Sequence, residues 1–538
     1  FGTNPAVSQS SFVHLEGGAT IFDRMRSRGA ETVFVDVRET ESARRWGGLV
    51  RVHAGSDVWL ILALLRLLAE GPPQRERVAD QQVQGLGRLL ELAQGIPLAR
   101  TTAMTGLPEA EIRDLAERIG ATKRVAFHMS VGVNQGRFGT LAYVALQALS
   151  YVTGNYDRRG GSLFSSLGVA AGRVARGAGL FTRRDRSRIG DFETVFDSLP
   201  GGILSEEILT PGEHQIRAMI VIAGDPLRSI PGARRLREAF SSLDTLVCLD
   251  LFENRTGELA HVLLPASSWL ERADFALPGL PLQTVELLQT TAAMMPRLGR
   301  SRADHEVLAR LSMAIGRPLF GDLPGARALT SLLGREGLVD RLVPKLTELG
   351  WRLFDGDPAR RTYGVRVPAP RPGSYLGVGP LTPGRAVRFW HASLEGEPAR
   401  LANCTPPGPG FVLLGRRRRI GHNSWLHGGV RAGGEASAVW MAEADMRALG
   451  LSDRDRVTLT TSQGSLSAPA RARSGVAPRT VVFPHGDPEV NINELLPAGV
   501  PHIEPLSGML HMTGVPVEVH PALPRDPTPE PRAEEACS

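Results

Sequence analysis

Short apolar runs alternate with amphipathic stretches through the first third of the chain. The pattern predicts buried strands at residues 32–35, 49–53 and 125–128, each followed directly by small or polar residues. Helices are expected at 39–46 and 57–68. Strands that alternate with helices favour a doubly wound parallel sheet, in which ligands bind at the carboxyl ends of the strands.

The same pattern returns later in the chain. Apolar runs at 218–223, 245–249 and 262–264 predict a second nucleotide-type sheet. Near the C-terminus, short strands separated by turns, at 457–461, 464–468 and 480–483, favour a β-barrel. The expected fold is therefore α/β, with two doubly wound nucleotide-binding domains followed by a C-terminal β-barrel domain.

A length of 538 residues exceeds that of one ordinary domain. Residues 357–385 are rich in proline, glycine and arginine, which indicates a linker or a long excursion. The tail is rich in proline and glutamate, and we expect it to be disordered. The proposed divisions are a first dinucleotide-binding domain at 1–135, a second α/β domain at 136–335, a linker or excursion at 336–405, a cofactor-binding barrel at 406–520 and the tail at 521–538.

The formal net charge of +6 comes almost wholly from arginine, since Lys123 and Lys345 are the only lysines. No basic stripe is interleaved with aromatic residues, so a nucleic-acid partner is not expected. Arginine suits bidentate recognition of phosphates and guanine edges, and the usage therefore fits a large anionic cofactor.

Cysteine usage and apolar run length exclude other classes. Cys248, Cys404 and Cys537 are far apart and form no Cys-x-x-Cys pair, so they cannot build a metal or iron–sulfur site by themselves. No apolar run approaches the length of about 18 residues that a transmembrane helix needs, and we expect no membrane span. The first residue is Phe1 rather than methionine and lies within a loop that looks functional, so an N-terminal portion is expected to be missing.

Three loops in the first predicted sheet carry candidate binding residues. Asn4 lies in a loop of small residues that would let backbone amides approach a phosphate, and Asp36 with Arg38 follows a strand end. Asp57 could accept hydrogen bonds from N1–H and N2–H of a guanine. Each residue alone reads more simply as a turn or helix N-cap. Together, at successive strand ends, they favour a dinucleotide.

Two further segments offer polar groups to a heterocycle. Asn134 and Gln135 lie in a glycine-rich stretch at 132–140, which leads into an expected helix at 141–151 and a polar loop at 153–161 that could also be a plain loop. The arginine run at 416–419 would alone indicate a solvated face. It leads, however, into a dense group of hydrogen-bond donors, His422, Asn423, Ser424 and His427, and is followed later by His485 and Asn493.

The order of these motifs resembles the dimethyl-sulfoxide-reductase superfamily of molybdopterin enzymes, which includes formate dehydrogenases and periplasmic-type nitrate reductases. The shared order runs from the Asn-Pro loop through the strand-end Asp with Arg, the Gly-Ser-Asp turn, the Asn-Gln segment and the Thr-Gly-Asn loop. It continues with a Gly-Asp-Pro loop, Asn-Ser-Trp-x-His and Pro-His-Gly, so the resemblance covers nearly all of 1–520. Residues 201–216 and 261–265 are most similar to formate-dehydrogenase- and acetylene-hydratase-like members.

The resemblance implies bis(molybdopterin guanine dinucleotide), in which two pterins clamp one Mo or W ion. One cofactor half would be held by Asn4, Asp36, Arg38 and Asp57, with Asn134 and Gln135 close to the pterins. The other nucleotide would contact Gly224, Asp225 and Asp250. From the barrel, the residues closing over both would be Arg419, His422, Asn423, Ser424, His427, His485 and Asn493.

Several features depart from the family pattern. Members usually begin with a cysteine-rich segment that holds a [4Fe–4S] cluster, followed by a Cys, selenocysteine or Ser that ligates the metal. Both precede the Asn-Pro loop, so the cluster is expected only in a missing N-terminal segment or from another chain. No metal ligand or catalytic residue is identified within 1–538. Asp225 replaces the commoner Asn, His261 the commoner Asp and Val37 the usual Pro.

The function that the resemblance implies is a two-electron redox reaction of a small substrate by a Mo or W oxidoreductase, with an electron-transfer subunit as a partner. A non-redox hydratase of the same family is one alternative. A structural subunit that has lost the cofactor is another, but it predicts erosion of nucleotide-contacting residues, and Asp36, Asp57, Asn423, Ser424 and His485 are intact in type. A cytoplasmic location is expected, with the periplasm as the alternative.

Overall fold

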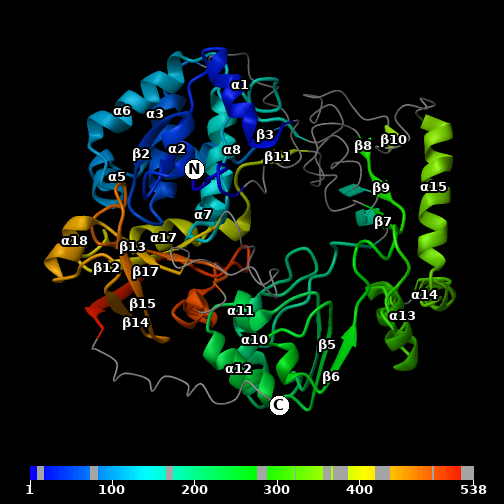
Figure 1. Ribbon diagram of the computed structural model, residues 1–538. Coiled ribbons are helices and arrows are strands. Elements are labelled where there is room, and N and C mark those ends of the chain that lie inside the picture. Colours follow the sequence, from blue (N-terminus) through cyan, green and yellow to red (C-terminus); the bar gives the residue numbers. More distant parts are fainter. Residues whose placement is uncertain are drawn as a thin grey trace.

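The computed structural model describes most of the chain. The described residues are 1–8, 17–72, 83–164, 172–173, 175–177, 179–275, 287–321, 323–354, 365–366, 386–418, 437–487 and 490–522. Figure 1 shows an α/β unit built from the first third of the chain, a barrel beside it, a second sheet with its own helices, and a peripheral group of helices. No helix among the described residues is long and apolar enough to span a bilayer.

The first unit contains a short parallel sheet. Strands β1 (Val33–Asp36) and β2 (Gly48–Arg51) pair in parallel, and α2 (Glu41–Trp46) connects them. The strand predicted at 125–128 was wrong, because this segment belongs to no strand. The free side of β1 is instead used by the start of the chain, because Gly2 N–H donates to the Val35 carbonyl at 3.0 Å.

A layer of helices covers this sheet. Its centre is α3 (Asp57–Ala69), whose apolar residues run around the whole helix and are therefore buried on all sides, with Leu60, Leu62 and Leu64 fully enclosed. It packs against α8 (Gly139–Val152). The remaining helical elements are η1 (Gly18–Thr20), α1 (Ile21–Ser27), α4 (Leu86–Gln94), α5 (Leu98–Thr105), α6 (Glu109–Ala121) and α7 (Val131–Asn134).

A late segment of the chain returns to this first unit. Strand β11 (Val387–Arg388) pairs in parallel with β3 (Val83–Gln84), and Phe389 joins the core around α3 and α8. Elements η8 (Ala392–Leu394) and α17 (Glu397–Ala402) follow. The first core therefore draws on residues from both sides of the proposed boundary at 135 and on part of the range proposed as a linker.

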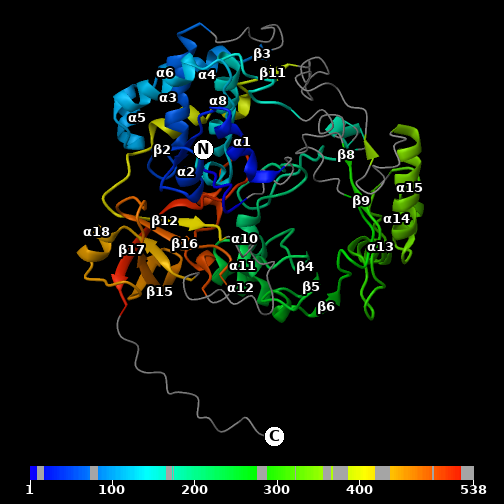
Figure 2. The same cartoon turned by 45° about the horizontal axis from the view of Figure 1, so that its top comes forward.

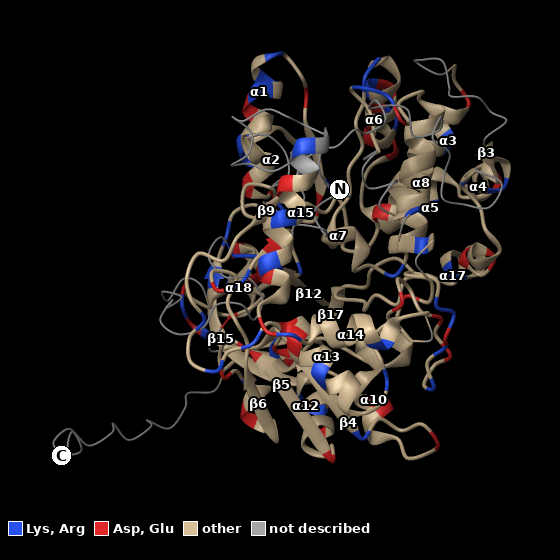
Figure 3. Ribbon diagram, turned by 90° about the vertical axis from the view of Figure 1, so that its right-hand side faces the viewer, with Lys and Arg blue, Asp and Glu red and all other residues tan. Residues whose placement is uncertain are grey.

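The second sheet is parallel, in the order β4-β5-β6. Helices α10 (Leu204–Leu209) and α12 (Ala233–Ser241) pack on one face of it, and Ile220, Ile222 and Val262 on the other face are exposed. In Figure 3 the three strands are uncharged along nearly their whole length. The bounds are β4 (Ala218–Ile222), β5 (Thr245–Asp250), β6 (Val262–Pro265), η3 (Gly201–Ile203), α11 (Pro226–Ser229) and η4 (Gly257–Leu259).

A peripheral group of helices lies away from the barrel in both Figures 1 and 2. An ion-pair cluster holds it, because Arg297 donates to Glu306 at 2.7 and 2.8 Å and to Asp340 at 2.7 Å. Its elements are α13 (Asp304–Ala314), α14 (Ala326–Leu333), α15 (Leu338–Phe354), β7 (Asp274–Phe275), β8 (Leu287–Leu288), β9 (Thr290–Thr291) and β10 (Val365–Arg366). Helix α15 falls within the range 336–405; most of the Pro- and Gly-rich stretch at 357–385 lies outside the described residues.

The last unit is a closed six-stranded barrel, which confirms the expected fold. The strands close in the order β12-β16-β13-β15-β14-β17 around a core that includes Leu413, Val439, Val457 and Phe483, all fully buried. The bounds are β12 (Phe411–Arg416), β13 (Val439–Met441), α18 (Glu443–Ala448), β14 (Arg456–Thr461), β15 (Gly464–Ala472), β16 (Thr480–Pro484), η9 (Ile492–Glu494), η10 (Val500–His502) and β17 (Thr513–Pro521). Of the tail expected at 521–538, Pro521 belongs to β17, and the residues from 523 lie outside the described residues.

Candidate functional site

A cavity of about 190 Å³ lies between the first α/β unit and the barrel. From the α/β side it is lined by loops that follow β1 and β2 and by the start of α7. From the barrel side it is lined by the end of β12, the loop after β16 and the start of β17. Six of the predicted binding residues line it: Asn4, Asp36, Arg38, Asp57, Gln135 and His485.

Close backbone packing positions the α/β side of the cavity. Gly132 N–H donates to the Gly2 carbonyl at 3.1 Å, and a Cβ on Gly132 would lie 2.8 Å from that oxygen. Residue 132 must therefore be glycine for the first loop to reach α7. Gly55 serves a different purpose: its φ is +72° and a Cβ there would meet nothing within 4 Å, so it leaves the cavity open beside Asp57.

Two carboxylates stand at this edge of the sheet. Asp36 ends β1, and its Oδ1 accepts from Val37 N–H at 2.8 Å and Arg38 N–H at 3.3 Å. Asp57 begins α3 and is 7% exposed. Burial raises the pKa of both, to about 6 for Asp57, which the nearby Asp36 carboxylate raises further. Both carboxylates would gain from a ligand that donates hydrogen bonds to them.

The side chain of Asn4 makes its hydrogen bonds within the protein. Its Nδ2 donates to Glu41 Oε2 at 2.7 Å, and its Oδ1 accepts from Ser42 N–H and Oγ–H at 3.2 and 2.7 Å. Glu41 also accepts from Arg38 at 3.1 Å. The side chain of Asn4 thus ties the first loop to α2, and only the rest of the loop faces the cavity freely.

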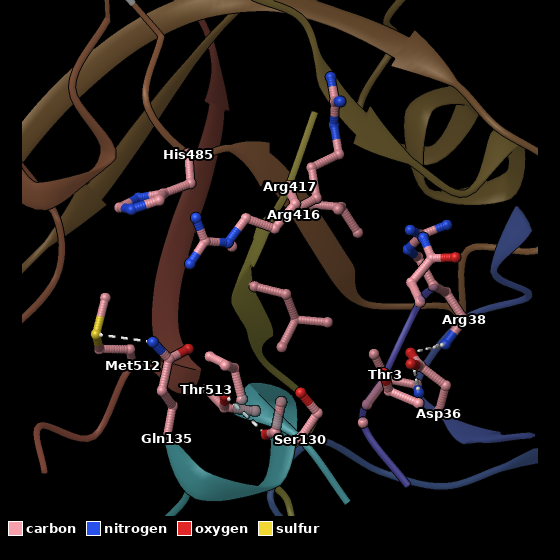
Figure 4. Close-up of a pocket in the computed structure, with 18 of the residues that line it drawn as sticks. Thr3, Asp36, Arg38, Ser130, Gln135, Arg416, Arg417, His485, Met512 and Thr513 are labelled. Atoms are coloured by element: carbon pink, nitrogen blue, oxygen red, sulfur yellow. Dashed lines mark hydrogen bonds between the residues drawn. The ribbon is translucent and has the colours of Figure 1, made fainter. Parts of the chain in front are cut away.

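Arginines dominate the barrel side. Arg416 ends β12 and is 8% exposed, and burial lowers its pKa to about 10, with Arg38, Arg418 and Arg473 lowering it further. In Figure 4, Arg416 extends between His485 and Gln135, whereas the neighbouring Arg417 extends in a different direction. A buried group of like charges favours binding of an anion.

Backbone and side-chain contacts hold the barrel on the α/β unit beneath the cavity. Met512 N–H donates to the Gln135 carbonyl at 3.0 Å, and Gln135 Nε2 donates to Met512 Sδ at 3.4 Å (Figure 4). Thr513 Oγ1 donates to the Gly132 carbonyl at 3.3 Å. Asn134, by contrast, is exposed and is not among the lining residues.

A second polar cluster lies where the second sheet meets the barrel. Asp225, which follows β4, is 1% exposed; its Oδ1 accepts from Thr256 Oγ1 at 2.6 Å, and its Oδ2 has no hydrogen-bond partner among the described residues. Asp250 ends β5 and accepts from Asn254 Nδ2 at 3.1 Å. Asn254 also donates to the Gly224 carbonyl at 3.4 Å, so the three predicted residues of this sheet come together.

The barrel reaches this cluster through Asn493. Its Nδ2 donates to the Arg228 carbonyl at 2.5 Å, and its buried Oδ1 has no hydrogen-bond partner within the described part of the chain. Arg228 faces charges of both signs: burial lowers its pKa first, Arg255 and Arg418 lower it further, and Asp225 and Asp487 raise it. Arg418 is 8% exposed at its side chain and pairs with Asp487 at 3.3 Å.

Some predictions fall outside this picture, and some site residues were missed. Arg419, His422, Asn423, Ser424 and His427 lie outside the described residues. Arg416 lies in the arginine run at 416–419, for which the sequence predicts only Arg419 as a binding residue. Arg228, Met512 and Thr513 gave no sequence signal, because their roles arise from packing between distant segments. No group of three or more His, Cys, Asp or Glu able to hold a metal ion occurs among the residues with described positions.

Family models match both parts of the chain. A model described as molybdopterin oxidoreductase matches residues 1–314, and one described as molydopterin dinucleotide binding domain matches residues 411–516. The two matches enclose the α/β units and the barrel, and so they include both polar clusters.

Known proteins are similar to this chain over part of their length. The probable oxidoreductase YjgC of Bacillus subtilis is 26% identical over 54% of this chain and 30% of its own length. The nitrate reductase of Klebsiella oxytoca is 25% identical over 53% and 33%, and the putative formate dehydrogenase YrhE of Bacillus subtilis is 23% identical over 59% and 32%. The chain thus matches about a third of the length of each of these relatives.

The fold is similar to that of a solved structure. The acetylene hydratase of Pelobacter acetylenicus superposes with a TM-score of 0.70 at 17% identity, covering 93% of this chain and 75% of the hydratase. At this identity the likeness concerns the fold alone. The sequence resemblance is confirmed by the family match, which spans 314 of 538 residues: the chain belongs to the molybdopterin oxidoreductase family.

Proposed function

We propose that this chain binds bis(molybdopterin guanine dinucleotide) with Mo or W and uses it in the two-electron redox reaction of a small substrate. One observation carries the proposal. Two groups of polar side chains, of the kind that bind nucleotides, lie at the carboxyl ends of the strands in two parallel sheets. Both groups face the barrel. Such strand ends are where open α/β sheets bind nucleotides, and two of them suit a cofactor with two nucleotides.

The first cavity fits one guanine dinucleotide. The Asp57 carboxylate can accept two hydrogen bonds from N1–H and N2–H of a guanine. Gly55 leaves room beside it, and Arg38 and Arg416 supply charge for a diphosphate. Asp36 stands at the strand end in position for a ribose or base edge.

The second cluster fits the other nucleotide. Asp225 Oδ2 and Asn493 Oδ1 are buried acceptors without a described partner, a costly state that a donating ligand would relieve. The guanidinium group of Arg228 lies near both Asp225 and Arg418, and the two arginines can offset phosphate charge. By the sequence resemblance, Arg419, His422, Asn423, Ser424 and His427 would close over both nucleotides.

Bound there, the cofactor would supply a metal that exchanges electrons in pairs, while the protein binds, orients and encloses it. The described residues of the two polar clusters would hold the two nucleotide ends between the barrel and the sheets. Gln135 places a carboxamide at the cavity wall, where we infer that it faces a pterin. The arginines would offset the negative charge of the cofactor.

The remaining parts of the proposal follow from the family resemblance. The substrate would be small, as it is for the formate dehydrogenase and nitrate reductases that the chain is similar to. A [4Fe–4S] cluster, the protein ligand of the metal and an electron-transfer subunit complete the expected redox enzyme, and none of them is assigned to residues 1–538.

Cofactor content tests the proposal directly. The chain is produced in a bacterial host that synthesises the cofactor, and the purified protein is assayed for Mo and W by mass spectrometry and for GMP released by acid. We expect two GMP per metal ion. Asp57→Asn and Asp225→Asn should each lower the GMP content, whereas Asp114→Asn on the exposed face of α6 should not. Purified wild-type chain without GMP would contradict the proposal.

A further inference from the structure

Trp440 lies at the junction between the barrel and the first α/β unit, and three arginines surround its ring. The guanidinium carbons lie 3.8 Å (Arg416), 5.1 Å (Arg473) and 5.7 Å (Arg38) from the ring centroid. The three come from separate segments: the end of β12, the turn after β15 and the loop after β1. Two of them, Arg416 and Arg38, line the cavity.

Bringing three guanidinium groups together costs electrostatic free energy, which the Trp440 ring partly offsets. Burial lowers the pKa of Arg416 to about 10, and its neighbours Arg38, Arg418 and Arg473 act in the same direction, whereas Glu41 raises it. Guanidinium groups this close repel each other, and the Glu41 carboxylate, which pairs with Arg38 at 3.1 Å, offsets only part of this repulsion. The face of an indole ring carries partial negative charge and is the strongest cation–π partner among side chains. Trp440 therefore stabilises the cluster without adding a formal charge that would compete with an anionic ligand.

The ring itself is fixed across the junction. Trp440 is in β13, opposite Val482 of β16, and it packs in an apolar cluster to which Val37 and Ala54 of the α/β unit also belong. The turn after β15 contacts the loop after β1, because Glu39 N–H donates to the Gly475 carbonyl at 2.9 Å. These contacts hold the Trp440 ring and the three arginines around it in one fixed arrangement.

We propose that Trp440 is a positioning residue, whose ring holds Arg38 and Arg416 at the cavity wall in the orientation that receives the diphosphate of a guanine nucleotide. The inference deepens the proposed function and rests on it. It assigns to Trp440 a contribution specific to the phosphates, since the guanine contacts lie elsewhere, at Asp57. A purely structural tryptophan would affect binding of guanosine and GDP alike.

The test is calorimetric binding of GDP and of guanosine to the full chain purified without cofactor. Trp440→Leu removes the ring face, and we expect its Kd for GDP to rise about 3- to 10-fold, in line with cation–π strengths at partly buried sites. Its Kd for guanosine should stay unchanged. Trp440→Phe keeps an aromatic face and should retain GDP binding to within about twofold. Should the Leu variant fail to fold, Trp440→Met takes its place with the same expectation.

Trp390 offers a matched control. Arg88 lies over its ring at 5.6 Å, the side chain is half-buried like that of Trp440, and it does not line the cavity. Trp390→Leu should therefore leave GDP binding unchanged. The inference is overturned if Trp440→Leu binds GDP as the wild type does, or loses guanosine and GDP equally. A wild-type chain that binds neither molecule overturns the proposed function, and this inference with it.

Discussion

Asp57 shows how a binding residue can reduce the stability of the protein that carries it. Its carboxylate begins a helix that is apolar on all sides and is itself 7% exposed. Burial raises its pKa to about 6, so at neutral pH folding must keep a charge in a poorly solvated place. A neutral side chain would be more stable there, and the acid is retained, in our proposal, because guanine donates two hydrogen bonds to it.

Asp57→Asn should therefore stabilise the ligand-free chain while weakening its binding of GDP. The carboxyl has a folded pKa raised above its ordinary value of 3.8, so the wild type loses stability as pH rises from about 4 through 6. The variant, which cannot ionise, should gain up to about 3 kcal/mol over the wild type at pH 7.5 and little at pH 4. Urea unfolding at the two pH values measures this difference.

Two measurements complete that prediction. Binding of GDP should weaken by about 1.5 to 3 kcal/mol, the usual contribution of hydrogen bonds to a charged group. Asp114→Asn, whose side chain is 64% exposed, is the control and should change stability by less than about 0.5 kcal/mol at either pH. Equal stability of Asp57→Asn and wild type at pH 7.5 would show that the carboxylate is well solvated.

At the scale of elements, the sequence pattern predicted correctly those helices and strands whose structure depends on residues of the same segment. Helix α3 begins at Asp57 as expected, because an uninterrupted apolar run leaves no polar face and must be buried whole. The run at 125–128 has the same apolar character as a buried strand, yet the place beside β1 is taken by Gly2. Competition between distant segments for one sheet edge is invisible in either segment alone.

The same distinction divides the candidate sites. Asp36, Asp57, Asp225 and Asp250 could be predicted from the sequence because each ends a strand or lies shortly after one. Trp440 could not, since it is one residue in a short strand and acquires its neighbours only when the barrel closes. Contacts made by three separate segments carry no periodicity for a sequence to show.

The helices α13 and α15 depend on one buried carboxylate. Glu306 is fully buried, accepts from Arg297 at 2.7 and 2.8 Å and accepts from Gly337 N–H at 2.8 Å. Glu306→Ala leaves the Arg297 cation short of its main partner and should cost about 3 to 5 kcal/mol, measured by chemical denaturation. Glu348→Ala, which removes an exposed pair with Arg352 on α15, should cost less than about 1 kcal/mol. Similar losses for the two variants would mean that the buried cluster does not hold these helices.

At the scale of the molecule, the barrel acts as a cover that closes over two sheets at once. Met512 and Thr513 of the barrel contact the first unit at α7. Asn491 and Asn493 of the barrel contact the second unit at α11. The peripheral helices α13–α15 lie away from both junctions (Figures 1 and 2). Ligand binding at the junctions should therefore stabilise the contacts between units without tightening the periphery.

Hydrogen exchange can measure that coupling across the molecule. A ligand that binds only the folded state raises the free energy of unfolding by an amount that depends on the ratio of the free ligand concentration to Kd. The increase is about 2.7 kcal/mol when the ligand concentration is one hundred times Kd. Where the barrel and the sheets separate locally, saturating GDP should slow the exchange of amides that bridge them, such as Met512 N–H and Glu39 N–H. Amides of α13–α15 should exchange at the same rate with and without GDP. Equal slowing in the periphery and at the junctions would instead show that the chain opens as one cooperative unit, so that the barrel is not a separate cover over the cofactor site.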